Sequence, residues 1–220
     1  MASRYAIYFV PDGIWGDFGA SWLGWDNRTG REIALASSDL AALTDRPRKY
    51  GFHGTVKPPF RLADGQSVDA LKRAVQGLCK GFEPFTLRSL QLTQIGRFFA
   101  MTAPDDHAAL RSVADSVVQE LDTFRAPLNE QELARRRASR LTARQEGLLQ
   151  RWGYPYVLEE FKFHLTLTGP CKNPDATRLV LEDALARVQN EPLSIDALCL
   201  LKEDDVGRHK VIARFPFGAV

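Results

Sequence analysis

Two triplets of the type His-x-Thr carry the residues of this sequence that are best suited to chemistry. They are His53-Gly54-Thr55 and His164-Leu165-Thr166, and each lies in an otherwise apolar stretch, YGFHGTVK and FKFHLTLTG. Histidine has an unperturbed pKa near ~6.5, so one imidazole can be neutral while another is charged at neutral pH. Two such rings beside one phosphorus atom fit in-line displacement, in which one removes a proton from the attacking oxygen and the other protonates the leaving oxygen.

Strand geometry extends this set to nearby threonines and lysines. If residues 51–57 and 161–169 are strands, their side chains alternate between two faces, so each histidine shares a face with a threonine and a lysine. Threonine hydroxyls can bind non-bridging phosphoryl oxygens, and a lysine can stabilise charge in the transition state. We therefore predict two catalytic residues and a phosphate-binding set: His53 and His164, with Thr55, Thr166, Lys57 and Lys162. No metal and no cofactor is expected, because acid–base groups and fixed donors supply the activation.

Tyrosines flank both triplets. Tyr50 stands just before the first, and Tyr154 and Tyr156 come before the second. Aromatic rings at a cleft mouth can stack on a base, and the same positions are also consistent with ordinary half-buried packing. These three tyrosines are candidate substrate-binding residues.

The elements that would position the triplets occur twice. In each half the triplet strand is followed by a helix, a Glu-Pro pair, a strand, a Gly-Arg pair and another strand. Apolar periodicity predicts these helices at Val68–Phe82, with Ser67 as N-cap, and at Asp175–Gln189, and a further amphipathic helix at Asp105–Phe124. His53 and His164 are 111 positions apart (164 − 53), and Gly96 and Gly207 are separated by the same 111 (207 − 96). Two matched halves predict a body with pseudo-twofold symmetry.

The predicted fold class is α+β, a bilobal pseudo-twofold repeat of strand–helix–strand–strand units. Antiparallel sheets line a central cleft, and a helical insert is added. Residues 1–220 are expected to form a single bilobal domain. Lobe one covers about 1–124, the insert about 125–157 and lobe two about 158–217, and strand exchange between the lobes is left open.

The insert is rich in arginine. Its middle, NEQELARRRASRLTARQEGLLQRW, has high helix propensity. Three interpretations stay open: a solvated helical arm with paired charges, a lid or basic wall over an anionic ligand, and an interface helix. Six arginines crowd the polar part of this segment: Arg135, Arg136, Arg137, Arg140, Arg144 and Arg151.

Bulk composition excludes some classes of protein. With 29 basic and 27 acidic residues the net charge is +2, which argues against a general nucleic-acid coat or a membrane-surface protein. The three cysteines are odd in number and share no CxxC spacing, which indicates reduced thiols in a cytoplasmic protein. The longest early apolar run, Tyr5–Val10, is too short for a signal peptide or a membrane span.

The stretches KYGFHGTVKPPFRL and FKFHLTLTGP resemble the two-histidine (2H) phosphoesterases, which carry paired His-x-Thr/Ser motifs on strands of two related lobes. They are similar to a bacterial branch linked to phosphonate metabolism. The resemblance covers most of the chain and implies a bilobal α+β fold, a central cleft and metal-free phosphoesterase chemistry. It also implies that His53, Thr55, His164 and Thr166 are the catalytic and phosphate-binding residues. Family members act on 2′,3′-cyclic phosphates or 2′-5′ linkages of RNA, or on small cyclic nucleotides.

The expected function is that of a hydrolase, a metal-independent phosphodiesterase acting on a small cyclic or diester phosphate. The substrate would be like a 2′,3′-cyclic phosphate or a phosphoribosyl compound, with a link to phosphonate metabolism. The alternative is an RNA- or nucleotide-binding module, similar to a 2′-5′ RNA ligase, without efficient turnover. RNA is the less favoured partner, because the insert departs from the compact family pattern. The oligomeric state and the assignment of acid and base to the two histidines stay open.

Overall fold

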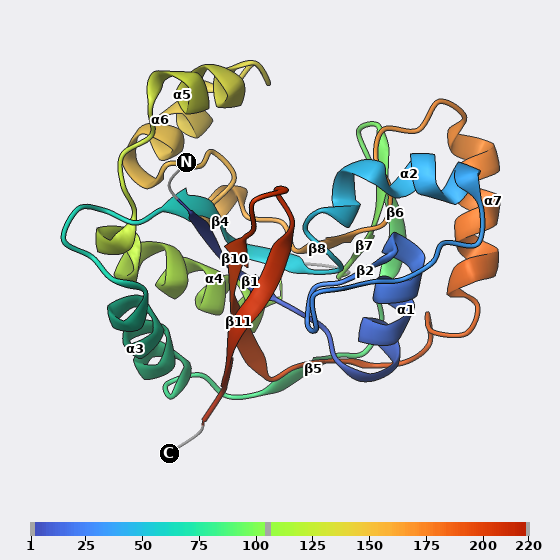
Figure 1. Ribbon diagram of the computed structural model, residues 1–220, viewed down its shortest axis with the longest axis horizontal. Coiled ribbons are helices and arrows are strands. Elements are labelled where there is room, and N and C mark those ends of the chain that lie inside the picture. The colour runs from blue at the N-terminus through green and yellow to red at the C-terminus, as the bar shows by residue number, and fades with distance from the viewer. Residues whose placement is uncertain (1–2, 104–106, 219–220) are drawn as a thin grey trace.

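The structure, a computed structural model, describes residues 3–103 and 107–218 (Figure 1). Helices and strands alternate along most of the described chain. The strands are β1 (Arg4–Phe9), β2 (Trp25–Asp26), β3 (Arg31–Glu32), β4 (Gly54–Arg61), β5 (Phe85–Leu87), β6 (Gln91–Ile95), β7 (Phe98–Thr102), β8 (His164–Thr166), β9 (Leu193–Ile195), β10 (Ala197–Glu203) and β11 (His209–Pro216). The α-helices are α1 (Gly13–Leu23), α2 (Ser38–Arg48), α3 (Val68–Cys79), α4 (Ala108–Glu120), α5 (Glu130–Arg137), α6 (Ala143–Trp152) and α7 (Pro174–Leu185).

The main sheet has seven strands in the order β11-β10-β1-β4-β8-β7-β6, and every neighbouring pair is antiparallel. The two triplets therefore meet at its centre, on β4 and β8. The hairpin of the first half, β6–β7, pairs with β8 of the second half, and the hairpin of the second half, β10–β11, joins β1 on the other side. The predicted α+β class with antiparallel strands is confirmed. The lobe boundaries stay a prediction.

Equivalent positions of the internal repeat pair with each other. Gly54 of the first triplet pairs with Leu165 of the second. The segments after the two Glu-Pro pairs form the β5–β9 ribbon, in which Thr86 lies opposite Ser194. When equivalent residues face each other across two antiparallel pairings, a pseudo-twofold axis must run through both points.

Several element bounds differ from the sequence expectation. β4 begins at Gly54 and runs on to Arg61, so His53 precedes it and the two prolines lie within it. β8 comprises only three residues instead of the expected 161–169. Helix α2 was not predicted, because it has a weak apolar periodicity and contains Pro47. The expected helix start at Asp105 lies outside the described residues.

The sheet has one face covered by helices and one that is more open. Tyr5, Ile7 and Phe9 of β1 join the main apolar core, which also includes residues of α1, α3, α4 and α7. Tyr8 and the other residues that alternate with them belong to a small cluster on the opposite face. Helix α3, whose N-cap Ser67 accepts a hydrogen bond from the Ala70 N–H as predicted, packs on the covered face.

The insert forms two helices, not one continuous helix. α5 and α6 each begin with a capping box and are joined by a turn (Figure 1). Leu148 of α6 packs with Val118 of α4 and with Val157 in a separate apolar cluster. α5 buries none of its residues, and its Arg137 pairs with Glu146 of α6 at 2.5 Å. The insert is therefore anchored through α6, and α5 stands beside the open face.

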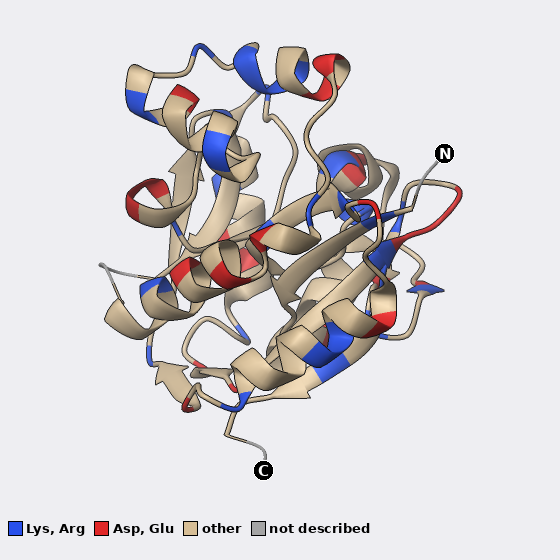
Figure 2. Ribbon diagram, turned by 90° about the vertical axis from the view of Figure 1, so that its left-hand side faces the viewer, with Lys and Arg blue, Asp and Glu red and all other residues tan. Residues whose placement is uncertain are grey.

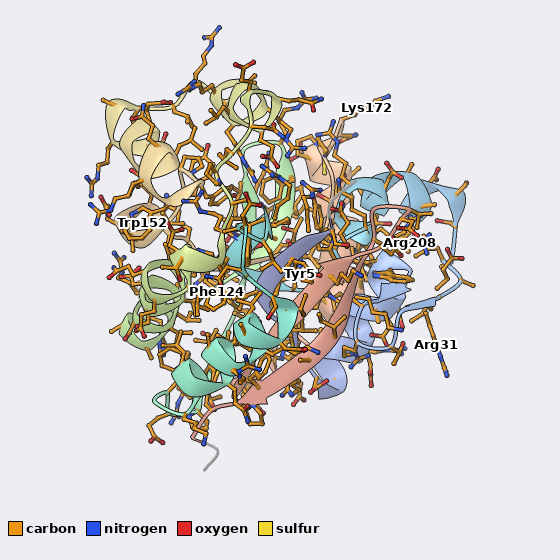
Figure 3. All side chains as sticks on the ribbon, turned by 60° about the vertical axis from the view of Figure 1, so that its left-hand side comes forward. Tyr5, Arg31, Phe124, Trp152, Lys172 and Arg208 are labelled. Atoms are coloured by element: carbon orange, nitrogen blue, oxygen red, sulfur yellow. The ribbon has the colours of Figure 1, made fainter. Side chains whose placement is uncertain are left out.

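In Figure 3, Trp152 of α6 and Arg208 of the β10–β11 turn lie on opposite sides of the molecule, with Tyr5 of β1 between them. The three cysteines are free, Cys79 and Cys199 being buried and Cys171 half-buried. Within the described ranges, no helix has the length and apolar character needed to cross a membrane.

Candidate active site

A cavity of about 430 Å³ lies on the more open face of the main sheet, opposite the face covered by helices, over β1, β4 and β8. Its floor includes Tyr8, His53, Thr55 and Thr166. Residues of the insert and of the segment that follows it form its upper wall. The cavity thus brings together the centre of the sheet and the arginine-rich insert.

His53 is held by local backbone geometry. Its Nδ1 lies 2.8 Å from the Gly51 carbonyl, and its Nε2 lies 3.1 Å from Oγ1 of Thr55. A carbonyl can only accept, so Nδ1 carries the proton and the Thr55 hydroxyl donates to Nε2. Gly51 has φ +72°, and a Cβ there would meet the Asn27 side chain at 2.5 Å, so this turn requires glycine.

The pKa of His53 is lowered to about 3, mainly by burial; interactions with His209 and His164 also lower it, and the bond to Gly51 opposes them. Stacking on Tyr8, with ring centroids 3.8 Å apart, fixes the plane of the imidazole. The resting ring is therefore neutral at neutral pH, with Nε2 as its basic atom.

His164 repeats this arrangement in the second half. Its Nδ1 lies 2.8 Å from the carbonyl of Lys162, again two residues earlier in the chain. Burial lowers its pKa as well. Both histidines therefore hold the same tautomer, with Nδ1 bonded to the backbone and Nε2 left for other contacts.

The strand register brings the two triplets together. Because Gly54 pairs with Leu165 in antiparallel register, position 53 lies across from 166 and position 55 across from 164. Each histidine therefore faces the threonine of the other triplet. His53, Thr55 and Thr166 line the cavity, whereas His164 is not among its lining residues and is placed beside Thr55 by the strand register.

The expectation that Lys57 shares the face of His53 is wrong. The β1–β4 register shifts between Tyr8–Thr55 and Ile7–Lys57, which is a β-bulge that inserts one extra residue in β4. Lys57 therefore turns to the helix-covered face, where it is buried. Its Nζ lies 3.3 Å from the Val118 carbonyl and 3.5 Å from Oδ1 of Asp122.

Lys162 is not brought to the cavity either. It lies before β8, its side chain is exposed, and it is its backbone carbonyl that contacts His164. The expected phosphate-binding role for its ammonium is not supported by this position, because the strand that would have oriented it begins only at His164. Two members of the predicted phosphate-binding set, Thr55 and Thr166, remain.

All three candidate tyrosines line the cavity, together with residues that sequence reasoning had missed or left open. The guanidinium of Arg136 lies over the ring of Tyr154, 4.6 Å from the centre of that ring. The arginine run of the insert was a visible signal for this wall, whereas Arg4 and Tyr8 gave none, because they lie on a strand far away in sequence. The additional lining residues are Arg4, Tyr8, Lys49, Pro58, Pro59, Arg135, Arg136, Ser139 and Pro155.

The sequence places His209 in a predicted hairpin, which favours a surface position, but the residue is fully buried. Its ring lies tilted against Tyr50 at 4.9 Å and stacks with Tyr8 at 6.1 Å, and burial lowers its pKa to about 4. It therefore stands behind the aromatic floor of the cavity and does not line it. Across the described ranges, no group of three or more His, Cys, Asp or Glu side chains is arranged to hold a metal ion.

A family model described as "Protein of unknown function (DUF1045)" matches residues 55–209, well over half of the chain. The chain belongs to this family. The matched DUF1045 region includes Thr55 and the whole second triplet and begins just after His53.

Two curated proteins resemble this DUF1045 chain, and both are named ribose 1,5-bisphosphate phosphokinase PhnN. The protein from Janthinobacterium sp. (strain Marseille) is 35% identical over 219 residues, which cover 93% of this chain and 48% of that protein. The one from Laribacter hongkongensis (strain HLHK9) is 35% identical over 178 residues, covering 78% of this chain and 41% of that protein. The chain thus spans about half the length of these relatives, or less.

Solved structures show more distant similarity. A crystal structure of a phosphoesterase aligns over 99% of both chains with 12% identity and a TM-score of 0.48. E. coli LigT complexed with 3'-AMP aligns over 99% of both chains with 13% identity and a TM-score of 0.46. TT0787 of Thermus thermophilus aligns over 100% of this chain and 99% of its own with 14% identity and a TM-score of 0.44.

Proposed function

We propose that the chain is a phosphodiesterase that hydrolyses a small cyclic phosphodiester by two-histidine general acid–base catalysis. One observation carries this proposal: both histidines donate Nδ1–H to a carbonyl two residues earlier, at 2.8 Å in each case. In the unliganded site Nε2 of His53 accepts from the Thr55 hydroxyl, and a substrate phosphate that takes this hydroxyl as its donor leaves both Nε2 atoms for the reaction.

In the proposed reaction a water oxygen attacks phosphorus while Nε2 of one histidine takes the water proton. The new P–O bond forms as the P–O bond to the leaving oxygen of the ring breaks, and Nε2 of the other histidine gives that oxygen a proton. The product is a phosphomonoester beside a free hydroxyl. The Thr55 and Thr166 hydroxyls donate to non-bridging phosphoryl oxygens.

The proton for the acid histidine arrives with the substrate. Burial lowers the pKa values of both His53 and His164, so both are neutral in the unliganded site. A bound phosphate anion raises the pKa of a neighbouring imidazole, because an opposite charge favours the charged form. We therefore expect ligand binding to be accompanied by proton uptake.

The names of the curated relatives support a phosphoribosyl substrate. They refer to ribose 1,5-bisphosphate, and the chain spans about half of those proteins or less. Opening a cyclic phosphate that joins O1 and O2 of ribose 5-phosphate, with O2 as the leaving oxygen, gives ribose 1,5-bisphosphate. A hydrolase of this kind would supply the compound that the relatives are named for phosphorylating.

The test is hydrolysis of a panel of cyclic phosphates in the presence of EDTA. The panel includes nucleoside 2′,3′-cyclic phosphates, ribose 1,2-cyclic phosphate and its 5-phosphate. We expect turnover that survives the chelator and falls by roughly a hundredfold or more in either His53→Ala or His164→Ala, the usual scale for loss of a general acid or base. His107→Ala is the matched control, since His107 stacks on Phe85 at 5.0 Å and does not line the cavity.

Full activity in both single variants would exclude the two-histidine mechanism. Activity abolished by EDTA and restored by a divalent metal would exclude the metal-free scheme. Tight nucleotide or RNA binding without turnover of any panel member would favour a binding module. In that case the affinity should fall steeply with salt if many phosphates are contacted.

A further inference from the structure

The wall of the cavity formed by the insert carries cations that lack carboxylate partners. Arg135 and Arg136 of α5 line the cavity, and Lys49 lines it from the end of α2. Within residues 3–103 and 107–218, no carboxylate lies within ion-pair distance of these three side chains. Three cations therefore line one cavity without a carboxylate in direct ion-pair contact, and Glu203 acts on Lys49 only at longer range.

Three other cations on or near this wall are paired with carboxylates. On the insert, Arg137 pairs with Glu146 at 2.5 Å, and Arg144 pairs with Glu159. Arg4, which also lines the cavity, makes two bonds to Glu203 at 2.6 and 2.7 Å. Arg140 and Arg151 of the insert also have no carboxylate within ion-pair distance among the described residues, so Arg135 and Arg136 are distinguished by lining the cavity. Figure 2 shows the basic and acidic positions along the ribbon of the insert.

Arg136 is the most constrained of the three cations. It is half-buried, and its guanidinium lies 4.6 Å from the ring centre of Tyr154. Burial lowers its pKa, Tyr154 opposes this, and the neighbouring charges of Arg135 and Arg4 lower it further. Holding a partly desolvated cation beside other cations costs free energy, unless a ligand supplies the negative charge.

This wall is separate from the histidine centre but opens into the same space. The triplets contribute the floor of the cavity from β4 and β8, and α5 contributes the opposite side. A phosphate held by the two threonines occupies only the floor. The unpaired cations thus face the remainder of the same ligand.

We propose that Arg136, together with Arg135 and Lys49, forms a second anion subsite that selects substrates carrying a phosphomonoester away from the scissile cyclic phosphate. This inference rests on the proposed function and names its specificity residues. A guanidinium offers paired N–H donors that match phosphate oxygens. The ring of Tyr154 holds the guanidinium of Arg136 in place, and the exposed side chains of Arg135 and Lys49 add positive charge at the edge of the cavity. The insert then distinguishes a substrate that carries a second phosphate group from one that carries only the cyclic phosphate.

The experiment compares kcat/KM for ribose 1,2-cyclic phosphate with and without a 5-phosphate. We expect the wild type to prefer the 5-phosphorylated compound, and Arg136→Gln to lower the ratio of the two kcat/KM values by roughly 10- to 100-fold, the scale of a lost charged hydrogen bond. Arg137→Gln removes the same charge one residue further along and should leave the ratio within about twofold, because exposed ion pairs contribute little. If Arg136 only supports the structure, both substrates will lose equally and the ratio will not move, which would overturn the proposal.

A binding measurement separates this inference from the catalytic one. Isothermal titration with ribose 1,5-bisphosphate and with ribose 1-phosphate should show tighter binding of the bisphosphate, lost in Arg136→Gln. If no cyclic phosphate is hydrolysed but this difference is found, the second subsite stands and the proposed reaction fails. If hydrolysis occurs and neither the binding difference nor the rate ratio depends on Arg136, the second subsite fails and the proposed reaction stands.

Discussion

The carbonyls of Gly51 and Lys162 determine which nitrogen each catalytic candidate can use. Each accepts Nδ1–H of the histidine two residues later, so Nε2 is the ring nitrogen that this backbone bond does not use. His53 lines the cavity, and His164 lies beside Thr55 in the strand register. Strand parity alone predicts that histidine and threonine share a face, but it does not predict the tautomer. That property comes from backbone geometry just before the strands, where the chain is not yet extended.

At the same scale, Lys57→Met tests whether this lysine belongs to the site. Its ammonium is buried, and burial lowers its pKa to about 8 despite Asp122. Asp122 keeps its bond from Arg125 at 2.8 Å in the variant. We expect kcat/KM to stay within about threefold and the free energy of unfolding, measured with urea, to be unchanged or higher by up to about 2 kcal/mol. A hundredfold loss of activity in a stable variant would return Lys57 to the phosphate site.

Lys57 also marks a limit of sequence reasoning. The alternation rule gave the right face for His53 and Thr55, because the register is regular up to Thr55. The bulge after it depends on how β1 pairs across the sheet, which no local pattern encodes. The cavity-lining positions of Arg4 and Tyr8 were unpredictable for the same reason, since β1 reaches the site only through the strand order.

At the scale of elements, the close pairing of β4 with β8 depends on one glycine, Gly54. A Cβ on Gly54 would lie 2.5 Å from Cε2 of Phe163, so a larger residue would push the two strands apart. The two halves of the repeat differ at this position, because the residue equivalent to Gly54 is Leu165, which packs in the main apolar core. One half therefore supplies the small residue and the other supplies the bulk.

We expect Gly54→Ala to lower the free energy of unfolding by about 1–3 kcal/mol, as overpacking does. Combined with Phe163→Leu, the loss should be smaller than the sum of the two single changes by more than about 0.5 kcal/mol, since the residues touch. Urea titration of the four proteins measures this coupling. Gly77→Ala on the exposed side of α3, where a Cβ meets nothing within 4 Å, is the control and should be neutral or stabilising. Additive effects would show that the contact between residue 54 and Phe163 does not determine how closely β4 and β8 pair.

The helices show which elements could be predicted from sequence. α3 and α4 were expected from their apolar periodicity, and both pack on the covered face. α2 escaped because its stability comes from tertiary contacts. Arg48, at its C-terminal end, donates to the carbonyls of Ala41 and Leu23. The insert was correctly read as helical, but its division into α5 and α6 follows from the Thr142 capping box, a second start signal within the run.

For the whole molecule, the neutral histidines make the fold sensitive to acid. Burial lowers the pKa of His53 to about 3 and that of His209 to about 4, whereas both titrate near ~6.5 when unfolded. Between these values the unfolded chain binds protons that the folded chain does not. Stability is therefore full above about pH 6.5 and falls as the pH decreases toward 4, by up to about 1.4 kcal/mol per pH unit for each histidine.

Urea unfolding at pH 7.5, 6.5, 5.5 and 4.5 measures this slope. His209→Phe removes one of the two groups from a pocket where neither ring nitrogen has a hydrogen-bond partner. We expect the free energy of unfolding of the variant to fall less steeply with decreasing pH than that of the wild type below pH 6.5. The difference in slope should correspond to about one proton fewer taken up on unfolding. Parallel curves would mean that His209 titrates alike in the folded and unfolded chain. Carboxylates that do not interact with His209 contribute equally to both proteins, so the difference between the curves reports on His209 together with Glu203, which interacts with it electrostatically.

The strand order also has a consequence for how the chain is made. β1 can find β4 soon after synthesis begins, but its other neighbour, β10, pairs Tyr5 with Lys202. A ribosome must therefore produce nearly all of the sequence described here before the outer edge of β1 is covered. Until then an apolar strand stands with unpaired backbone groups, which favours aggregation. Nascent chains of this fold should thus depend on holding chaperones during translation, and the sheet should close only after the last hairpin emerges.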